Sequence, residues 1–65
     1  MPRYFFNLRF DDVFARDPIG IEIIDLDHAI AEAEKARAEI MDEEALDHLW
    51  LEITDENGRV VAKVG

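Results

Sequence analysis

The sequence predicts an α+β protein of two layers, β-β-α-β-β in order, with one helix packed on one face of an antiparallel four-stranded sheet. Apolar residues recur at every second position in residues 3–10 and again within residues 49–64, as they do in strands. Between these stretches the apolar period is 3.6, which is the period of a helix. The length of 65 residues is below the usual domain size of about 100 to 150, so residues 1–65 are expected to form a single domain.

The first strand is predicted over residues 3–10, where one face carries only Tyr4, Phe6, Leu8 and Phe10. Asp11 and Asp12 form a short polar break, after which residues 13–16 are expected to return as a brief antiparallel strand. The order Asp17-Pro18-Ile19-Gly20 suits a type I turn. Residues 21–24 then resume as an extended segment and are a candidate fifth strand.

A helix is predicted to begin at Asp25 or Asp27, because a carboxylate there accepts backbone N–H groups and meets the positive end of the helix dipole. It is expected to end between Asp42 and Ala45. The residues of its apolar stripe are Leu26, Ala29, Ile30, Ala33, Ala36, Ile40 and Met41. The stripe is rich in alanine, so the helix can lie close against the sheet.

The last two strands are predicted over residues 49–54 and 59–64, joined by a turn at Asp55-Glu56-Asn57-Gly58. A two-residue loop at Asn57-Gly58 would pair Glu56 with Arg59, Glu52 with Lys63, Leu51 with Val64 and Ile53 with Ala62. A three-residue loop with Gly58 in the left-handed conformation would instead pair Asp55 with Arg59 and move Lys63 opposite Leu51. The first register is favoured because charge and apolarity both agree with it, and a slip of one residue exchanges the faces.

The small size of the chain predicts that it self-associates as a homodimer. A chain of this mass buries only about 60% of its unfolded surface, which leaves a thin core. The sequence has no cysteine, so neither disulfides nor thiolate zinc sites can add stability. A marginally stable monomer is the alternative.

The net charge of −9 is concentrated in residues 25–48, where nine acids and two bases leave −7. Such a charge disfavours nucleic acid and anionic membranes as partners. No apolar run approaches the 18 or so residues of a membrane span, and the first residues lack a signal-peptide pattern. A cytoplasmic protein without a membrane segment is therefore expected.

The residue types present predict a protein that is not an enzyme and holds no cofactor or metal. The chain has no Ser or Cys and a single Thr, so it lacks the usual catalytic nucleophiles. Its three glycines are far apart and form no phosphate-binding loop. His28 and His48, even with Asp25, Asp27 and Asp47, match no metal-ligand spacing.

Two surfaces are candidate interaction sites. Strand alternation places large aromatic and charged residues on the sheet face away from the helix, where such a patch often marks an interface. This candidate interface consists of Arg3, Phe5, Asn7, Arg9, Trp50 and Glu52. The alternative is that residues 11–24 or a chain end cover Phe5 and Trp50. The candidate acidic surface lies on the helix and consists of Glu32, Glu34, Glu39 and Asp42.

The predicted function is a small acidic interaction module that is not an enzyme and that self-associates through the outward sheet face or an edge strand. In the alternative function, the acidic helix binds a basic protein, as a regulatory or antitoxin-like partner would.

The chain resembles a family of short uncharacterised bacterial proteins, classed as a domain of unknown function. The resemblance rests on Pro2-Arg3-Tyr4-Phe5-Phe6-Asn7-Leu8, on Gly20-Ile21-Glu22 and on Trp50-Leu51-Glu52-Ile53-Thr54-Asp55-Glu56-Asn57-Gly58-Arg59. It implies a fold and no activity. The arrangement of residues 17–33 is also similar in topology to HicB-type antitoxins, which act by capping a basic toxin.

Overall fold

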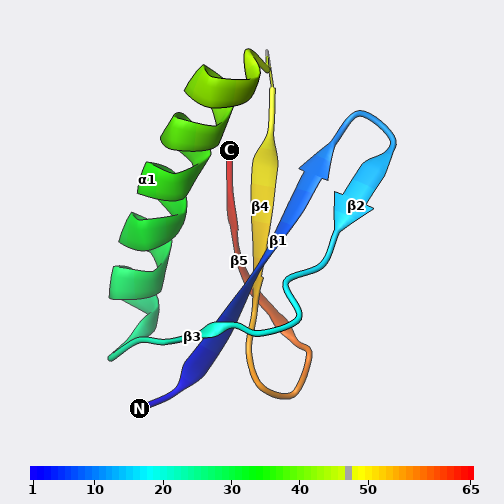
Figure 1. Cartoon of the computed structure of the whole chain (residues 1–65). Helices are drawn as coiled ribbons and strands as arrows, with labels where there is room; N and C mark the ends of the chain where they lie inside the picture. Colours follow the sequence, from blue (N-terminus) through cyan, green and yellow to red (C-terminus); the bar gives the residue numbers. More distant parts are fainter. Residues whose placement is uncertain (47) are drawn as a thin grey trace.

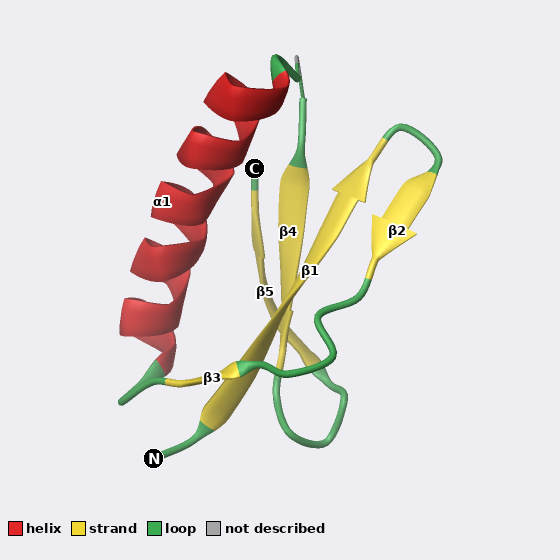
Figure 2. Cartoon of the chain, in the orientation of Figure 1, coloured by secondary structure: helices red, strands yellow, loops and turns green. Residues whose placement is uncertain are grey.

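The computed structural model describes residues 1–46 and 48–65 and confirms the predicted α+β fold (Figures 1 and 2). Its elements in chain order are β1 (Arg3–Phe10), β2 (Val13–Ala15), β3 (Ile21–Glu22), α1 (Leu26–Glu44), β4 (Trp50–Thr54) and β5 (Val60–Val64). Within the described residues, no helix is both long and apolar enough to cross a membrane.

The sheet is antiparallel in the order β2-β1-β4-β5, and β3 pairs separately with β1. Phe10 and Leu8 pair with β2, while Arg3 and Tyr4, at the other end of β1, pair with β3. β1 is the longest strand because its alternation continues unbroken for eight residues. The candidate fifth strand at residues 21–24 is therefore present but shorter, since only Ile21 and Glu22 join the ladder.

α1 begins at the predicted cap, Asp25, whose side chain accepts a hydrogen bond from the His28 backbone N–H at 2.9 Å. It ends at Glu44, followed by Ala45 in the left-handed conformation with φ of 53°. Ala29 and Ala33 of the predicted stripe are fully buried. Because their side chains are small, α1 packs closely over β4 and β5 (Figure 1).

The core lies between α1 and the sheet. Leu49, Leu51 and Ile53 have the largest fully buried side chains among the described residues. Ala33 and Val64 join this core, and the apolar face of β1 packs against its side. The inward faces predicted for the strands at residues 3–10 and 49–54 are thus confirmed.

The last hairpin combines the two predicted registers. Leu51–Val64, Glu52–Lys63 and Ile53–Ala62 pair as the favoured register requires. Thr54 nevertheless pairs with Val60, so a bulge interrupts the ladder at this point.

The loop itself follows the second alternative, and the predicted pairing of Glu56 with Arg59 is wrong. The Asp55 N–H donates to the Arg59 carbonyl at 3.0 Å, and Gly58 has φ of 80°. The Asp55 side chain stabilises this longer loop by accepting from the N–H groups of Asn57 and Arg59. The bulge absorbs the extra loop residue, so the strand residues keep their faces.

Candidate functional site

The outward sheet face brings together most of the predicted interface. The register places Phe5 beside Thr54, Asn7 beside Glu52, and Arg9 beside Trp50. Since neighbours across a ladder point to the same side of a sheet, these residues share the face away from α1. Arg3 lies apart from the others, at the β3 end of β1.

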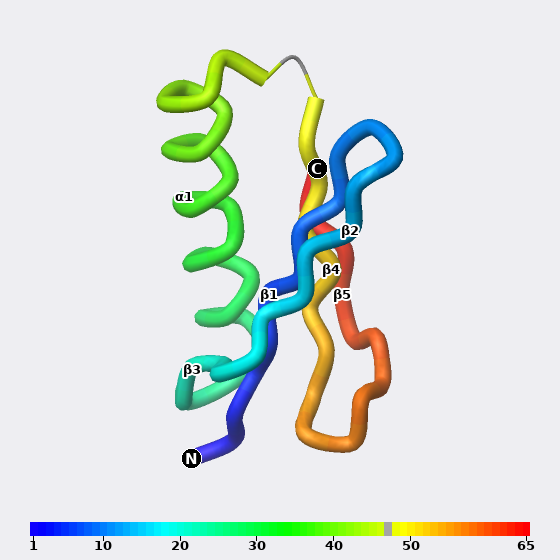
Figure 3. The backbone as a smooth tube through the Cα atoms, turned by 45° about the vertical axis from the view of Figure 1, so that its right-hand side comes forward, coloured from blue at the N-terminus to red at the C-terminus, as the bar shows by residue number. Residues whose placement is uncertain are grey.

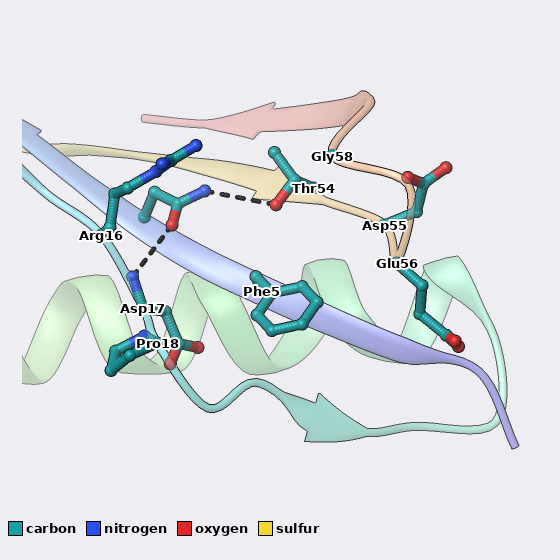
Figure 4. Close-up of a pocket in the computed structure, with 9 residues that line it drawn as sticks. Phe5, Arg16, Asp17, Pro18, Thr54, Asp55, Glu56 and Gly58 are labelled. Atoms are coloured by element: carbon teal, nitrogen blue, oxygen red, sulfur yellow. Dashed lines mark hydrogen bonds between the residues drawn. The ribbon is translucent and has the colours of Figure 1, made fainter.

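Asn7 lies at the centre of this face and is only 4% exposed. Its Oδ1 accepts a hydrogen bond from the Asp17 N–H at 3.0 Å, and its Nδ2 donates to Thr54 Oγ1 at 3.3 Å (Figure 4). Both ends of the amide are therefore used within the chain. Asn7 ties the segment after β2 to β4 and has little surface to offer a partner.

Asp17 fills the gap between β2 and β3 along the edge of β1. One carboxylate oxygen accepts from the Phe6 N–H at 3.2 Å, and the other accepts from the N–H groups of Ile19 and Gly20, each at 3.0 Å. The carboxylate thus takes the place of a missing strand neighbour and also closes the following turn. We call this set of hydrogen bonds the Asp17 latch.

The electrostatics of the latch suit a structural role. Burial raises the pKa of Asp17, but the backbone donors Gly20, Ile19 and Phe6, together with the charge of Arg3, outweigh it and lower the pKa below its ordinary value. A general acid at neutral pH requires a raised pKa instead. Asp17 therefore acts as a fixed hydrogen-bond acceptor.

The Asp17 latch holds residues 17–20 in contact with Phe5. Gly20 has φ of 76°, and a Cβ atom there would lie 2.8 Å from a carbon of the Phe5 ring, so only glycine fits. Beside it, a shallow cavity of about 390 Å³ is lined by Phe5, Arg16, Asp55 and Glu56, among others (Figure 4). Phe5 is half-buried as a result. The sequence had left open whether it would be exposed on the outward face or covered, and it lies between these two states.

The other end of the outward face carries a cluster of cations and aromatic rings. The Arg9 guanidinium lies 4.1 Å from the centre of the Phe14 ring and 5.5 Å from that of Trp50. The Lys63 ammonium lies 5.3 Å from the Trp50 ring. Arg9 Nε also lies 3.5 Å from a Glu52 carboxylate oxygen, as an ion pair without hydrogen-bond geometry. Trp50 is half-buried among these cations.

Sequence reasoning did not place Phe14 and Lys63 in this cluster. The signal for Phe14 was the two-residue break at Asp11 and Asp12, because such a loop puts Phe14 opposite Arg9. The favoured register of the last hairpin already put Lys63 opposite Glu52. Both residues could therefore have been assigned to the outward face from strand pairing.

Arg3 anchors the segment between β2 and α1 and takes no part in the cation–aromatic cluster. Its guanidinium pairs with Glu22 at 3.0 Å and donates to the carbonyls of Ile19 and Gly20 at 2.9 and 3.3 Å. Its backbone N–H donates to Glu56 at 3.0 Å. The predicted interface residues are thus divided between two ends of the sheet.

The candidate acidic surface lies on the solvent side of α1. Its four members, Glu32, Glu34, Glu39 and Asp42, are all exposed. No ion pair found within residues 1–46 and 48–65 includes any of them. Their charges are therefore presented together to solvent.

The two histidines lie near opposite ends of α1. His28 Nδ1 is 2.7 Å from the Asp25 carboxylate, whose hydrogen bond and charge raise the pKa of His28. The backbone and side-chain hydrogen bonds from His28 in turn lower the pKa of Asp25. His48 Nε2 is 3.6 Å from Asp11. The described structure does not bring the two histidines to one site, and Asp47 lies outside the described residues.

A second surface, which sequence reasoning missed, lies on the helix side of the sheet. α1 covers β4 and β5, while the β1–β2 hairpin extends beside its C-terminal end (Figure 3). Between them is an apolar groove of about 390 Å³, lined by Leu8, Phe10, Ala15, Ile40, Glu44 and Leu46. Finding it requires knowing which strands the helix covers, and the periodicity of the helix does not contain this information.

Comparison with known proteins identifies one similar family. A family model described as a domain of unknown function, DUF6894, matches residues 3–65. The match therefore includes the outward sheet face, the acidic surface and the apolar groove. Neither the curated proteins nor the solved structures contain a match to the chain.

Proposed function

Since the chain belongs to the DUF6894 family, a domain of unknown function, we propose from its surface that it is a non-enzymatic interaction module that self-associates as a homodimer. The observation that supports this most is the apolar groove beside β2, lined chiefly by Leu8, Phe10, Ile40 and Leu46. Aliphatic and aromatic side chains that line an open groove gain free energy when a partner removes them from water.

The exposed area of the chain also favours a partner. Its accessible surface is 4546 Å², whereas a compact monomer of this mass exposes about 4,200 Å². A standard interface removes about 800 Å² from each partner. An interface that includes the groove would cover its apolar side chains and enlarge the small core formed around Leu51 and Ile53.

Light scattering behind gel filtration, at tens of micromolar protein, tests the proposal. We expect a mass of about twice 7.5 kDa for the wild type. Ile40→Glu, which puts a charge into the groove, is expected to shift the mass towards that of a monomer. Ile24→Glu is the matched control, because Ile24 is 62% exposed outside the groove, and it should keep the wild-type mass.

Circular dichroism of both variants checks that they remain folded. A monomer mass for the wild type up to 200 μM would contradict self-association. A dimer unaffected by Ile40→Glu would remove the groove from the interface.

A second candidate function is the binding of a basic protein by the acidic helix face. The observation that favours it is that its four carboxylates are exposed together and take part in none of the ion pairs found in the described residues. Such a face attracts a basic partner through long-range electrostatics.

Recovery of basic proteins from an extract of the native cell tests this second function. The variant replaces three acids of the face, and the control removes the same charge elsewhere. They are Glu32→Gln/Glu34→Gln/Glu39→Gln on α1 and Asp11→Asn/Glu22→Gln/Glu56→Gln outside the helix. A partner retained by the wild type and the control but lost by the first variant is expected. Equal recovery with both variants would reject a specific role for this face.

A further inference from the structure

We propose that the homodimer forms through the free edge of β2, where Val13–Ala15 of two copies pair antiparallel around a two-fold axis at Phe14, flanked by Asp12 of the turn and by Arg16. This inference rests on the self-association proposed above and identifies its interface. The joined sheet would run through both copies, with β2 next to β2 of the partner.

β2 stands at the end of the sheet, with β1 on one side and no described strand on the other (Figure 1). All three of its residues are exposed. An exposed strand edge carries unpaired N–H and C=O groups and is a template for pairing with another chain.

The backbone groups of Phe14 face this open side. The Phe6 N–H points to the β2 side of β1, because it donates to Asp17. Backbone groups along a strand alternate in direction, so Leu8 also faces β2, whereas Arg9 faces β4. Phe14, which pairs with Arg9, therefore turns its own N–H and C=O away from β1. These two groups can bond their counterparts in a second copy.

The sequence of this segment is complementary to itself. With Phe14 opposite Phe14, an antiparallel pair sets Val13 opposite Ala15 and Asp12 opposite Arg16, twice each by symmetry. Asp12 and Arg16 are both exposed, and neither side chain has a hydrogen bond or ion pair within the described residues. Two reciprocal ion pairs would thus flank an apolar centre, which also counters the repulsion between two chains of charge −9.

Both faces of the joined sheet would gain contacts. On the outward face, Phe14 is 41% exposed and would meet its symmetry mate beside the Arg9 guanidiniums. On the helix side, Val13 is 47% exposed and shares its face with Phe10. A two-fold axis perpendicular to the sheet puts both helices on the same side, so the two apolar grooves would adjoin.

The opposite edge of the sheet suits self-pairing less well. β5 itself contains a bulge, between Val60 and Ala62, which disrupts the regular ladder and twists the edge away from other strands. Antiparallel pairing about Ala62 would set Lys63 opposite Val61 and Val60 opposite Val64, without a charge partner for the lysine. The complementarity of residues 12–16 therefore favours β2.

Cysteine cross-linking tests the position of the axis. The natural chain has no cysteine, so a Phe14→Cys variant can form only the disulfide between the two copies of residue 14. Hydrogen-bonded partners in an antiparallel ladder have Cα atoms about 5.5 Å apart, within the range of a disulfide. We expect Phe14→Cys to become a covalent dimer under mild oxidation, while Ala62→Cys, the self-facing position of the β5 pairing considered above, stays largely monomeric in a denaturing gel.

The outcomes separate this inference from the proposed function. Rapid cross-linking of Ala62→Cys with little from Phe14→Cys, in a wild type that is a dimer by light scattering, would overturn the β2 interface and leave self-association standing. A monomeric wild type would overturn both.

Charge reversal gives an independent test that does not depend on the phenylalanine. Asp12→Arg and Arg16→Asp each convert both reciprocal pairs to like charges, so each should raise the dimer dissociation constant about five- to tenfold. The double variant restores the pairs with opposite polarity and keeps the net charge of −9, so it should recover nearly wild-type dimerisation. If the free-energy losses of dimerisation in the two single variants simply added up in the double variant, the proposed register would be overturned.

Discussion

Asp17→Ala is expected to lower the free energy of unfolding by about 2–3 kcal/mol at pH 7. Three backbone donors, those of Phe6, Ile19 and Gly20, lose a charged acceptor in this variant. Hydrogen bonds to charged groups contribute about 1.5–3 kcal/mol each, and partial exposure of the site reduces the sum because water replaces some of them. The whole fold is stable by only about 3–10 kcal/mol at this length, so the loss is a large fraction.

The effect should depend on pH with a defined sign. The pKa of Asp17 is lower in the folded state than its ordinary value, so the ionised latch stabilises the fold fully above the unfolded-state pKa of about 3.9. This contribution is lost as the pH falls through the folded-state pKa. Wild type and Asp17→Ala should therefore differ most at neutral pH and converge towards pH 2.

Urea denaturation at pH 7 and at pH 2–3 measures both predictions. Glu39→Ala is the control, because Glu39 is exposed on α1 and its loss should change the unfolding free energy by less than about 0.5 kcal/mol. An equal deficit of Asp17→Ala at both pH values would show that the carboxylate charge does not stabilise the segment.

Ile53→Ala is expected to cost about 3–4 kcal/mol of unfolding free energy. Ile53 is 0% exposed and belongs to the cluster in which Ala33 of α1 meets the sheet. Removing three carbon atoms there forfeits their burial and leaves a cavity, and the surrounding ladder restricts collapse around it. The loss approaches the total stability expected of so short a chain.

Urea midpoints of three variants make this prediction measurable even if Ile53→Ala does not fold. Ile53→Val should cost about 0.5–1.5 kcal/mol. Ile24→Ala, at a position that is 62% exposed, should cost less than about 0.5 kcal/mol. The assignment of Ile53 to the core would be contradicted if Ile53→Val unfolded at the wild-type urea midpoint, as Ile24→Ala is expected to do.

Much of the fold could be predicted because hydrophobic period and turn chemistry are local properties. The alternation around Phe6 and Leu8 was enough to define β1, and the acids near Asp25 to locate the start of α1. The last hairpin shows the boundary of this reasoning. Charge pairing identified the strand register, whereas hydrogen bonds to the Asp55 side chain selected the loop and required a bulge.

The candidate site was predictable in part. Strand parity alone placed Arg9, Trp50 and Glu52 on one face. The burial of Asn7 was not predictable, because it depends on where residues 16–20 lie along the edge of β1, and the bond from the Phe6 N–H to the Asp17 carboxylate fixes that position. The apolar groove was missed for a similar reason, since it exists only because α1 covers β4 and β5 and leaves β2 beside it.

The sequence by itself therefore determined the order and type of the elements, the apolar face of each and the acidic character of the helix, because these properties depend on neighbours along the chain. Only the tertiary structure decided which surfaces stay open. The Asn7 side chain is hydrogen-bonded to the Asp17 segment, Phe14 lies beside Arg9 and Trp50, and β2 is an exposed edge. These outcomes depend on how separate strands and segments lie against one another, and that arrangement arises only when the elements pack.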